Sequence, residues 1–226
     1  MVSPLSQLLR APACGCSLLQ VADGALLIGS RIGHSLDPLV LRIYGFLFLG
    51  KRPTPNILTV CGLFISLAAA YVAAFHQMLL AAGILLLLSG FFDLMDGAVA
   101  RKTLMVTRFG GFLDSVLDRY SDLLVMLGIS AYFLGAHDPF FCIVTSFAAV
   151  GVAIVPYARA RAEAASIACR NGILERPERI ALLVIGLLFG VVVLKIVVII
   201  LAVLTHVTVM QRIWFVRRQS AEGVEI

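Results

Sequence analysis

Acidic side chains recur at helical spacing within one of the most apolar parts of the chain. Asp93 and Asp96 lie three residues apart, and Asp114 and Asp118 lie four residues apart further along. If both segments are helical, residues three and four apart share a face, so each segment presents a stripe of carboxylates. Two such stripes that face each other would form a box of carboxylates.

These carboxylates need a compensating charge if they lie in a membrane. An aspartate near the centre of a bilayer-spanning helix costs ~2.5–3.5 kcal/mol on insertion scales. Four like charges cannot neutralise one another, and Arg101 and Arg119 cannot balance all of them. An all-oxygen cluster suits hard divalent cations such as Mg²⁺, Mn²⁺ or Ca²⁺. Two metal ions in an acidic pocket in turn indicate phosphoryl-type transfer.

Glycines lie on the same two stripes. Gly97 and Gly110 remove side chains where a ligand or a neighbouring backbone must approach the acidic faces. The fixed positions of the region run Asp93-x2-Asp96-Gly97-x2-Ala100-Arg101-x8-Gly110-x3-Asp114-x3-Asp118. This string resembles the signature of the CDP-alcohol phosphotransferase family, with all eight fixed positions filled.

The resemblance implies an activity and a set of site residues. It implies an integral membrane enzyme with six helices, usually a homodimer, that joins an alcohol to a phosphatidyl or similar group and releases CMP. Two ions of Mg²⁺ or Mn²⁺ per active site would be held by the metal ligands Asp93, Asp96, Asp114 and Asp118, with Asp118 also the catalytic base. The residues at the CDP moiety would be Pro55, Asn56, Thr59, Gly97, Ala100, Arg101 and Gly110, the first three through a similar short Pro-Asn-x-x-Thr element.

Composition places the chain among polytopic membrane proteins. Of its 226 residues 61% are hydrophobic, and the mean hydropathy is +1.01. The net charge of +5 is spread over short segments between apolar runs, which is typical of membrane topology and argues against a nucleic-acid partner. The five cysteines show neither zinc spacing nor a disulfide framework.

The apolar runs predict an all-α fold with six transmembrane helices. We expect an interfacial amphipathic helix over 35–50, then spans over 57–75, 78–100, 109–134 and 140–157, the last continuing as a more polar helix. The apolar stretch 180–210 is too long for one upright span, so we expect a hairpin that turns near Lys195. The predicted organisation is an N-terminal segment (1–52), the membrane domain (53–218) and a short tail (219–226).

The distribution of Lys and Arg predicts the orientation. With six spans, most of these residues fall on one side, which the positive-inside rule assigns to the cytoplasm. Both termini and the acidic motif would then face the cytoplasm, and the protein would be a multi-pass protein of the inner (plasma) membrane. A water-soluble substrate could reach the site from that side.

The segment between the fourth and fifth predicted spans indicates the second substrate. Its basic residues are all arginine, which suits forked recognition of phosphate, although membrane topology alone explains their charge. The pieces 157–163 and 175–179 resemble the phosphatidylinositol-phosphate synthase branch and its archaeal relative. That resemblance implies CDP-diacylglycerol or a similar CDP-lipid as donor and inositol phosphate as acceptor, with glycerol 3-phosphate as the alternative. The acceptor-phosphate residues would be Arg159, Arg179 and Arg212.

Other interpretations of the acidic residues remain open. Carboxylates in a membrane also mark ion paths, so a cation-coupled transporter is the alternative class, although the acids lie at one end of the bundle and no pair of broken helices appears. An inactive scaffold would have no use for four costly carboxylates. Asp122 continues the spacing outside the family pattern, and we expect it to pair with Arg119 or a neighbouring polar group instead of binding metal.

Overall fold

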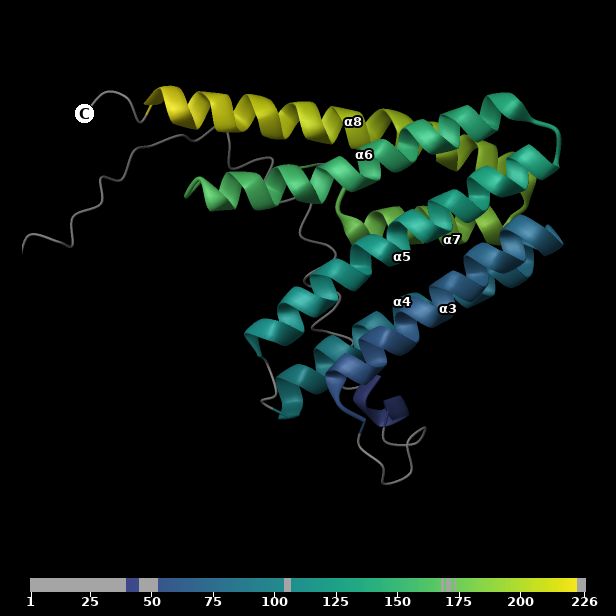
Figure 1. Ribbon diagram of the computed structural model, residues 1–226, viewed down its shortest axis with the longest axis horizontal. Helices are drawn as coiled ribbons and strands as arrows, with labels where there is room; N and C mark the ends of the chain where they lie inside the picture. Colours follow the sequence, from purple (N-terminus) through teal and green to yellow (C-terminus); the bar gives the residue numbers. More distant parts are fainter. Residues whose placement is uncertain are drawn as a thin grey trace, which may run out of the picture.

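The computed structural model describes residues 40–44, 53–103, 107–167, 169, 172 and 174–222. Within these ranges all regular secondary structure is helical, as the sequence predicts, and residues 40–44 are helical as well. The long helices are α3 (Pro55–His76), α4 (Leu79–Thr103), α5 (Arg108–Gly135), α6 (Pro139–Ala164), α7 (Arg176–Leu188) and α8 (Val191–Glu222) (Figure 1).

Local chemistry fixes several of the helix ends. Pro55 occupies the first turn of α3, where its missing N–H leaves no intrahelical bond unmade. The Thr107 hydroxyl caps α5 by accepting from the Gly110 N–H at 2.9 Å, and the Asp138 carboxylate caps α6 by accepting from the Phe141 N–H at 3.3 Å. The helix bounds show that the turns between α3 and α4 and between α5 and α6 are short, so these neighbouring helices run antiparallel.

The helices form two groups that meet at α5. In Figure 1, α3, α4 and α5 lie together and α6 runs beside α8, and the contacts between helices agree: α3 packs on α4 and α5, while α6 packs on α5 and α8. Helix α7 also joins the two groups, because it packs on α4 of the first group and on α8 of the second. The fully buried side chains between these helices include Met126, Ile129, Phe133, Leu187, Leu194 and Leu201.

Four of the described helices are long and apolar enough to cross a membrane, namely α3, α4, α6 and the part of α8 up to Ser220. The chain is therefore a membrane protein. Helix α5 has 28 residues, but it carries Asp114, Asp118 and Asp122. Helix α7 has 13 residues, which at ~1.5 Å per residue cover ~20 Å of a ~30 Å hydrocarbon core.

Four of the predicted helix positions are confirmed, and the last hairpin is not where it was predicted. The spans expected over 57–75, 78–100, 109–134 and 140–157 correspond to α3, α4, α5 and α6. The hairpin near Lys195 was misplaced, because α7 ends at Leu188 and Lys195 lies within α8. Gly190 makes the turn with a φ of +92°, a conformation that side chains with a Cβ disfavour. Of the helix expected over 35–50, only 40–44 fall within the described residues.

Lys195 is neutralised by the turn between α5 and α6. Its Nζ lies 2.7 Å from Asp138 Oδ2 and 4.7 Å from the centroid of the Phe141 ring. The hydrogen bond from Lys195 lowers the pKa of Asp138, which lies just outside the helix that follows it. The pair thus ties the start of α8 to the end of the bundle opposite the acidic motif.

This ion pair predicts an acid-sensitive contribution to stability. Because folding lowers the pKa of Asp138 from its ordinary value of about 3.9, the contribution is present above that pH and is lost as the pH falls through the lowered pKa. The thermal unfolding midpoint of the wild type should therefore exceed that of Asp138→Asn at neutral pH, and the difference should shrink on acidification. A difference that stays constant down to a pH of about 3 would contradict this.

Candidate active site

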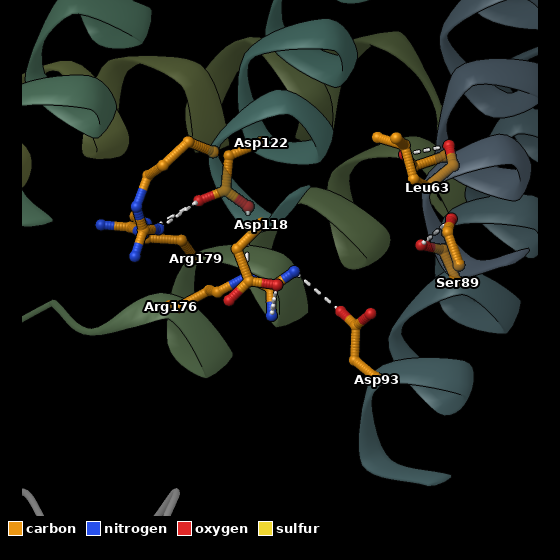
Figure 2. Close-up of polar contacts among 10 residues, drawn as sticks. Leu63, Ser89, Asp93, Asp118, Asp122, Arg176 and Arg179 are labelled. Atoms are coloured by element: carbon orange, nitrogen blue, oxygen red, sulfur yellow. Dashed lines mark hydrogen bonds and ion pairs between the residues drawn. The ribbon is translucent and has the colours of Figure 1, made fainter. Parts of the chain in front are cut away.

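The acidic residues of α4 and α5 gather with the first turn of α7. Figure 2 shows Asp93 from α4 and Asp118 and Asp122 from α5 pointing toward Arg176 and Arg179 of α7. The helical spacing of the acids puts them on one face of each helix, as the sequence predicts. The arginines come from a segment far along the chain. Helix α7 begins at Arg176 and has Pro177 in its first turn, so both arginines lie in that turn.

Arg176 bridges three carboxylates. Its Nη2 lies 2.7 Å from Asp93 Oδ2, its Nη1 lies 2.8 Å from Asp118 Oδ1, and its Nε lies 3.4 Å from Asp122 Oδ1. The planar guanidinium suits this arrangement because its donors diverge in a fixed fork. Helices α4, α5 and α7 are thereby joined through a single side chain. Sequence reasoning did not assign Arg176 to the site, although its position in the Glu175–Arg179 segment was the available signal.

Asp122 is a structural partner of the arginines. Its Oδ2 lies 3.1 Å from Arg179 Nη2 and 3.6 Å from Arg119 Nη1. The predicted pair with Arg119 is confirmed, and the two further partners from α7 were not foreseen. Both Asp122 and Arg179 are buried, and removing Asp122 would take away the carboxylate that pairs with Arg179.

The remaining acids lie close to this network. The negative charge of Asp114 acts on Asp93, Asp96 and Asp118, so the structure brings the predicted metal ligands into one neighbourhood. Asp96 is buried, and its Oδ2 has no hydrogen-bond partner among the described residues. A buried carboxylate oxygen without a donor is costly, so it requires a cation or another polar group.

The cluster contains more carboxylates than guanidinium groups. Five aspartates gather with three arginines; the members are Asp93, Asp96, Asp114, Asp118, Asp122, Arg119, Arg176 and Arg179. In the described part of the chain no three His, Cys, Asp or Glu side chains converge as a ready metal site. Figure 2 shows the Arg176 guanidinium beside Asp93 and Asp118, with which it forms ion pairs. The oxygen donors and the unpartnered Asp96 Oδ2 nevertheless fit a divalent ion.

The predicted nucleotide residues lie around the ends of α3, α4 and α5. A Cβ on Gly110 would come within 3.2 Å of Asn56 Oδ1, so the starts of α3 and α5 are adjacent. A Cβ on Gly97 would lie 3.2 Å from an Nη atom of Arg101. The Thr59 hydroxyl donates to the Pro55 carbonyl at 3.1 Å, one turn earlier in α3. Ala100 is half-buried on α4 between Gly97 and Thr103.

The predicted acceptor-phosphate arginines fall into two neighbourhoods. Arg179 belongs to the carboxylate network. Arg159 is exposed on α6 and pairs with Glu163 at 2.9 Å, while Arg212 of α8 is only 3% exposed and donates to the Val155 carbonyl of α6. The charge of Arg159 acts on Arg212, so these two share one region, at the end of α6. Arg212 therefore has a packing role in addition to the role predicted for it.

An all-helical membrane protein with carboxylates gathered at one end of its helices is the class that this fold and site define. The model of the CDP-alcohol phosphatidyltransferase family matches residues 52–215. The chain belongs to this family and is a transferase.

Two relatives similar to this chain carry the same enzyme name. The chain is 41% identical over 171 residues to an archaetidylinositol phosphate synthase of Pyrococcus horikoshii, covering 75% of this chain and 87% of the relative. It is 39% identical over 190 residues to the enzyme of the same name from Methanothermobacter thermautotrophicus, covering 82% and 90% of the two chains.

Solved structures of one enzyme also resemble this fold. The phosphatidylinositol phosphate synthase of Mycobacterium tuberculosis with CDP-DAG bound superposes with a TM-score of 0.69 at 31% identity, covering 82% of this chain and 94% of that one. Its complex with manganese and citrate gives a TM-score of 0.68 at 32% identity, covering 80% and 88%.

Proposed function

We propose that this protein transfers the phosphatidyl group of CDP-diacylglycerol, or of a similar CDP-lipid, to a hydroxyl of inositol phosphate. The products are phosphatidylinositol phosphate, or its counterpart with the donor's lipid, and CMP. The observation that carries the proposal is the carboxylate cluster of α4 and α5, which lies within the region that matches the family and has more carboxylates than guanidinium groups. The names of the relatives support the acceptor, and the CDP-DAG bound to the mycobacterial enzyme supports the donor.

The carboxylates would hold the metal. Asp93, Asp96, Asp114 and Asp118 are the ligands that we propose for two ions of Mg²⁺ or Mn²⁺, which would polarise the phosphoryl oxygens and stabilise the departing CMP. Manganese in the related mycobacterial structure supports the use of a divalent ion.

Asp118 is the proposed general base. The acceptor oxygen forms a bond to the phosphorus of the phosphatidyl phosphate, and the bond from that phosphorus to the bridging oxygen of CMP breaks. Asp118 accepts the proton of the attacking hydroxyl, and CMP leaves as an anion. The side chain of Asp118 points into the cluster toward Arg176, so it lies where such a hydroxyl would have to approach (Figure 2).

Nucleotide and acceptor would bind beside the carboxylates. We assign the CDP moiety to Pro55, Asn56, Thr59, Gly97, Ala100, Arg101 and Gly110, at the ends of α3, α4 and α5. The acceptor phosphate is assigned to Arg159, Arg179 and Arg212, whose forked donors match phosphate oxygens.

Membrane placement completes the proposal. Helices α5 and α7 would join the four apolar helices to make six spans, with their charged ends near the membrane surface. The positive-inside rule then puts the carboxylates at the cytoplasmic face of the cell membrane. A homodimer is proposed from family resemblance.

The proposal is tested by offering several acceptors to the purified protein. Detergent-solubilised protein with Mg²⁺ or Mn²⁺ and CDP-diacylglycerol should release CMP with inositol phosphate and little with free inositol or serine. A preference for glycerol 3-phosphate would refute inositol phosphate as the acceptor, while the proposed reaction class would stand. Absence of CMP release with every acceptor would favour the transporter interpretation.

Replacing Arg159 should weaken acceptor binding selectively. An exposed pair such as Arg159–Glu163 is worth only ~0.3–0.5 kcal/mol, so Arg159 can leave Glu163 for a phosphate at little cost. We expect Arg159→Gln to raise the KM for inositol phosphate by about 10-fold or more with little change in the KM for CDP-diacylglycerol, because a charge-assisted hydrogen bond contributes roughly 1.5–3 kcal/mol.

Arg217→Gln is the matched control, because Arg217 is exposed near the end of α8. It should leave both KM values unchanged. An equal rise in the KM for inositol phosphate in both variants would indicate a general charge effect and would refute the assignment of Arg159.

A further inference from the structure

The Arg176 guanidinium lies where the metal ligands would have to converge. Its contacts of 2.7 Å with Asp93 and 2.8 Å with Asp118 engage an oxygen of each carboxylate, one from α4 and one from α5. Its third contact, with Asp122, is longer at 3.4 Å and lies on the side of the guanidinium that carries Nε. Arg176 is therefore the counter-ion of Asp93 on α4 and of Asp118 on α5.

A divalent ion and this guanidinium compete for the same carboxylate oxygens. Both neutralise the negative charge of Asp93 and Asp118, and both are cations, so they repel each other when they are close together. A divalent ion approaches carboxylate oxygens at about 2.0–2.2 Å, closer than a guanidinium nitrogen, and it restricts where other donors can reach them.

We infer that Arg176 and the divalent ion are alternative occupants of the space between Asp93 and Asp118. Metal loading releases Arg176 from these two acids, while Asp122 retains it through Nε. Arg179, which is held by Asp122 Oδ2 at 3.1 Å, keeps the first turn of α7 in place during the exchange. Arg176 thus stabilises the metal-free protein and is a positioning residue in the loaded one.

This inference rests on the metal site of the proposed function and explains a feature which that function leaves open. A membrane enzyme without its metal would otherwise hold two uncompensated carboxylates at this position, a costly state in a medium of low dielectric constant. Because of the exchange, the apparent free energy of metal binding is the free energy of binding the ion less the free energy needed to release Arg176.

Mn²⁺ binding to Arg176→Gln tests the exchange without measuring activity. The Kd for Mn²⁺ can be measured by titrating the purified protein and following the free ion by electron paramagnetic resonance. The Kd of Arg176→Gln should be about 5- to 150-fold lower than that of the wild type, the range typical of coupled sites. The rise in unfolding midpoint on adding Mn²⁺ should also be larger for Arg176→Gln than for the wild type. Arg217→Gln, which removes an exposed arginine elsewhere, should bind Mn²⁺ as the wild type does.

The outcomes separate the exchange from the proposed function. Equal Mn²⁺ affinity in the wild type and Arg176→Gln would overturn the exchange and leave the metal site intact. No Mn²⁺ binding by either protein would overturn both. If Arg176→Gln does not fold, the Mn²⁺-bound structure of the wild type decides: Arg176 should lie beyond ion-pair distance of Asp93 and Asp118, and retention of both contacts beside a bound ion would refute the inference.

Discussion

Asp118→Asn should lower the rate of CMP release by about 10²–10⁴-fold, the range typical for loss of a general acid or base. Asparagine keeps the size of the side chain but cannot accept the proton of the acceptor hydroxyl. It also removes one of the proposed metal ligands and one partner of Arg176, whose Nη1 lies 2.8 Å from Asp118. Binding of CDP-diacylglycerol should be partly retained, because the residues assigned to the nucleotide are unchanged.

Asp138→Asn is the matched control for this loss. It makes the same chemical change at the α5–α6 turn, where Asp138 pairs with Lys195. It should retain turnover at temperatures where it is folded. Full activity of Asp118→Asn would refute the assignment of Asp118 as base, even if the family and the metal site stand.

Gly128→Ala should destabilise the bundle by about 1–3 kcal/mol, the usual cost of adding a methyl group to a filled core. A Cβ on Gly128 would lie 2.6 Å from the Ala70 carbonyl oxygen and 2.7 Å from Ala70 Cα, both backbone atoms of α3. Because the backbone of a helix cannot turn aside as a side chain can, α3 and α5 must separate. The separation would also disturb the site, since Asn56 and Asp118 are carried by these two helices.

Gly111→Ala tests whether the effect comes from helix packing. Gly111 lies in the same helix, and a Cβ there would meet nothing within 4 Å. Alanine should therefore be neutral or stabilise α5 by up to ~1 kcal/mol through its higher helix propensity. Unfolding midpoints in detergent should separate the two variants, and equal midpoints would contradict the close approach of α3 and α5.

The sequence was sufficient to predict the helices and the acidic faces. Local signals such as Pro55 ahead of an apolar run indicated where a helix begins. The spacing of Asp114 and Asp118 put them on one face of α5 because helical geometry alone decides this. The turn at Gly190 was misplaced because Lys195 was taken as its marker.

The charges that complete the site required the structure. Lys195 stays within α8 because Asp138 neutralises it, a pairing that no local pattern reveals. Arg176 meets Asp93 across 83 residues of sequence, and helical periodicity carries no information at that separation. The pair between Asp122 and Arg119 was predicted, but the two partners of Asp122 in α7 depend on how α7 packs beside α4 and α8.

The most direct test of the carboxylate site is metal-dependent product formation by the purified protein. With CDP-diacylglycerol, inositol phosphate and Mn²⁺ or Mg²⁺, we predict CMP and phospholipid in equal amounts, no product after chelation, and full recovery when the ion is restored. Product formation that is indifferent to chelation, or an absence of CMP under all of these conditions, would contradict the central claim that the acids of α4 and α5 bind divalent ions for phosphatidyl transfer.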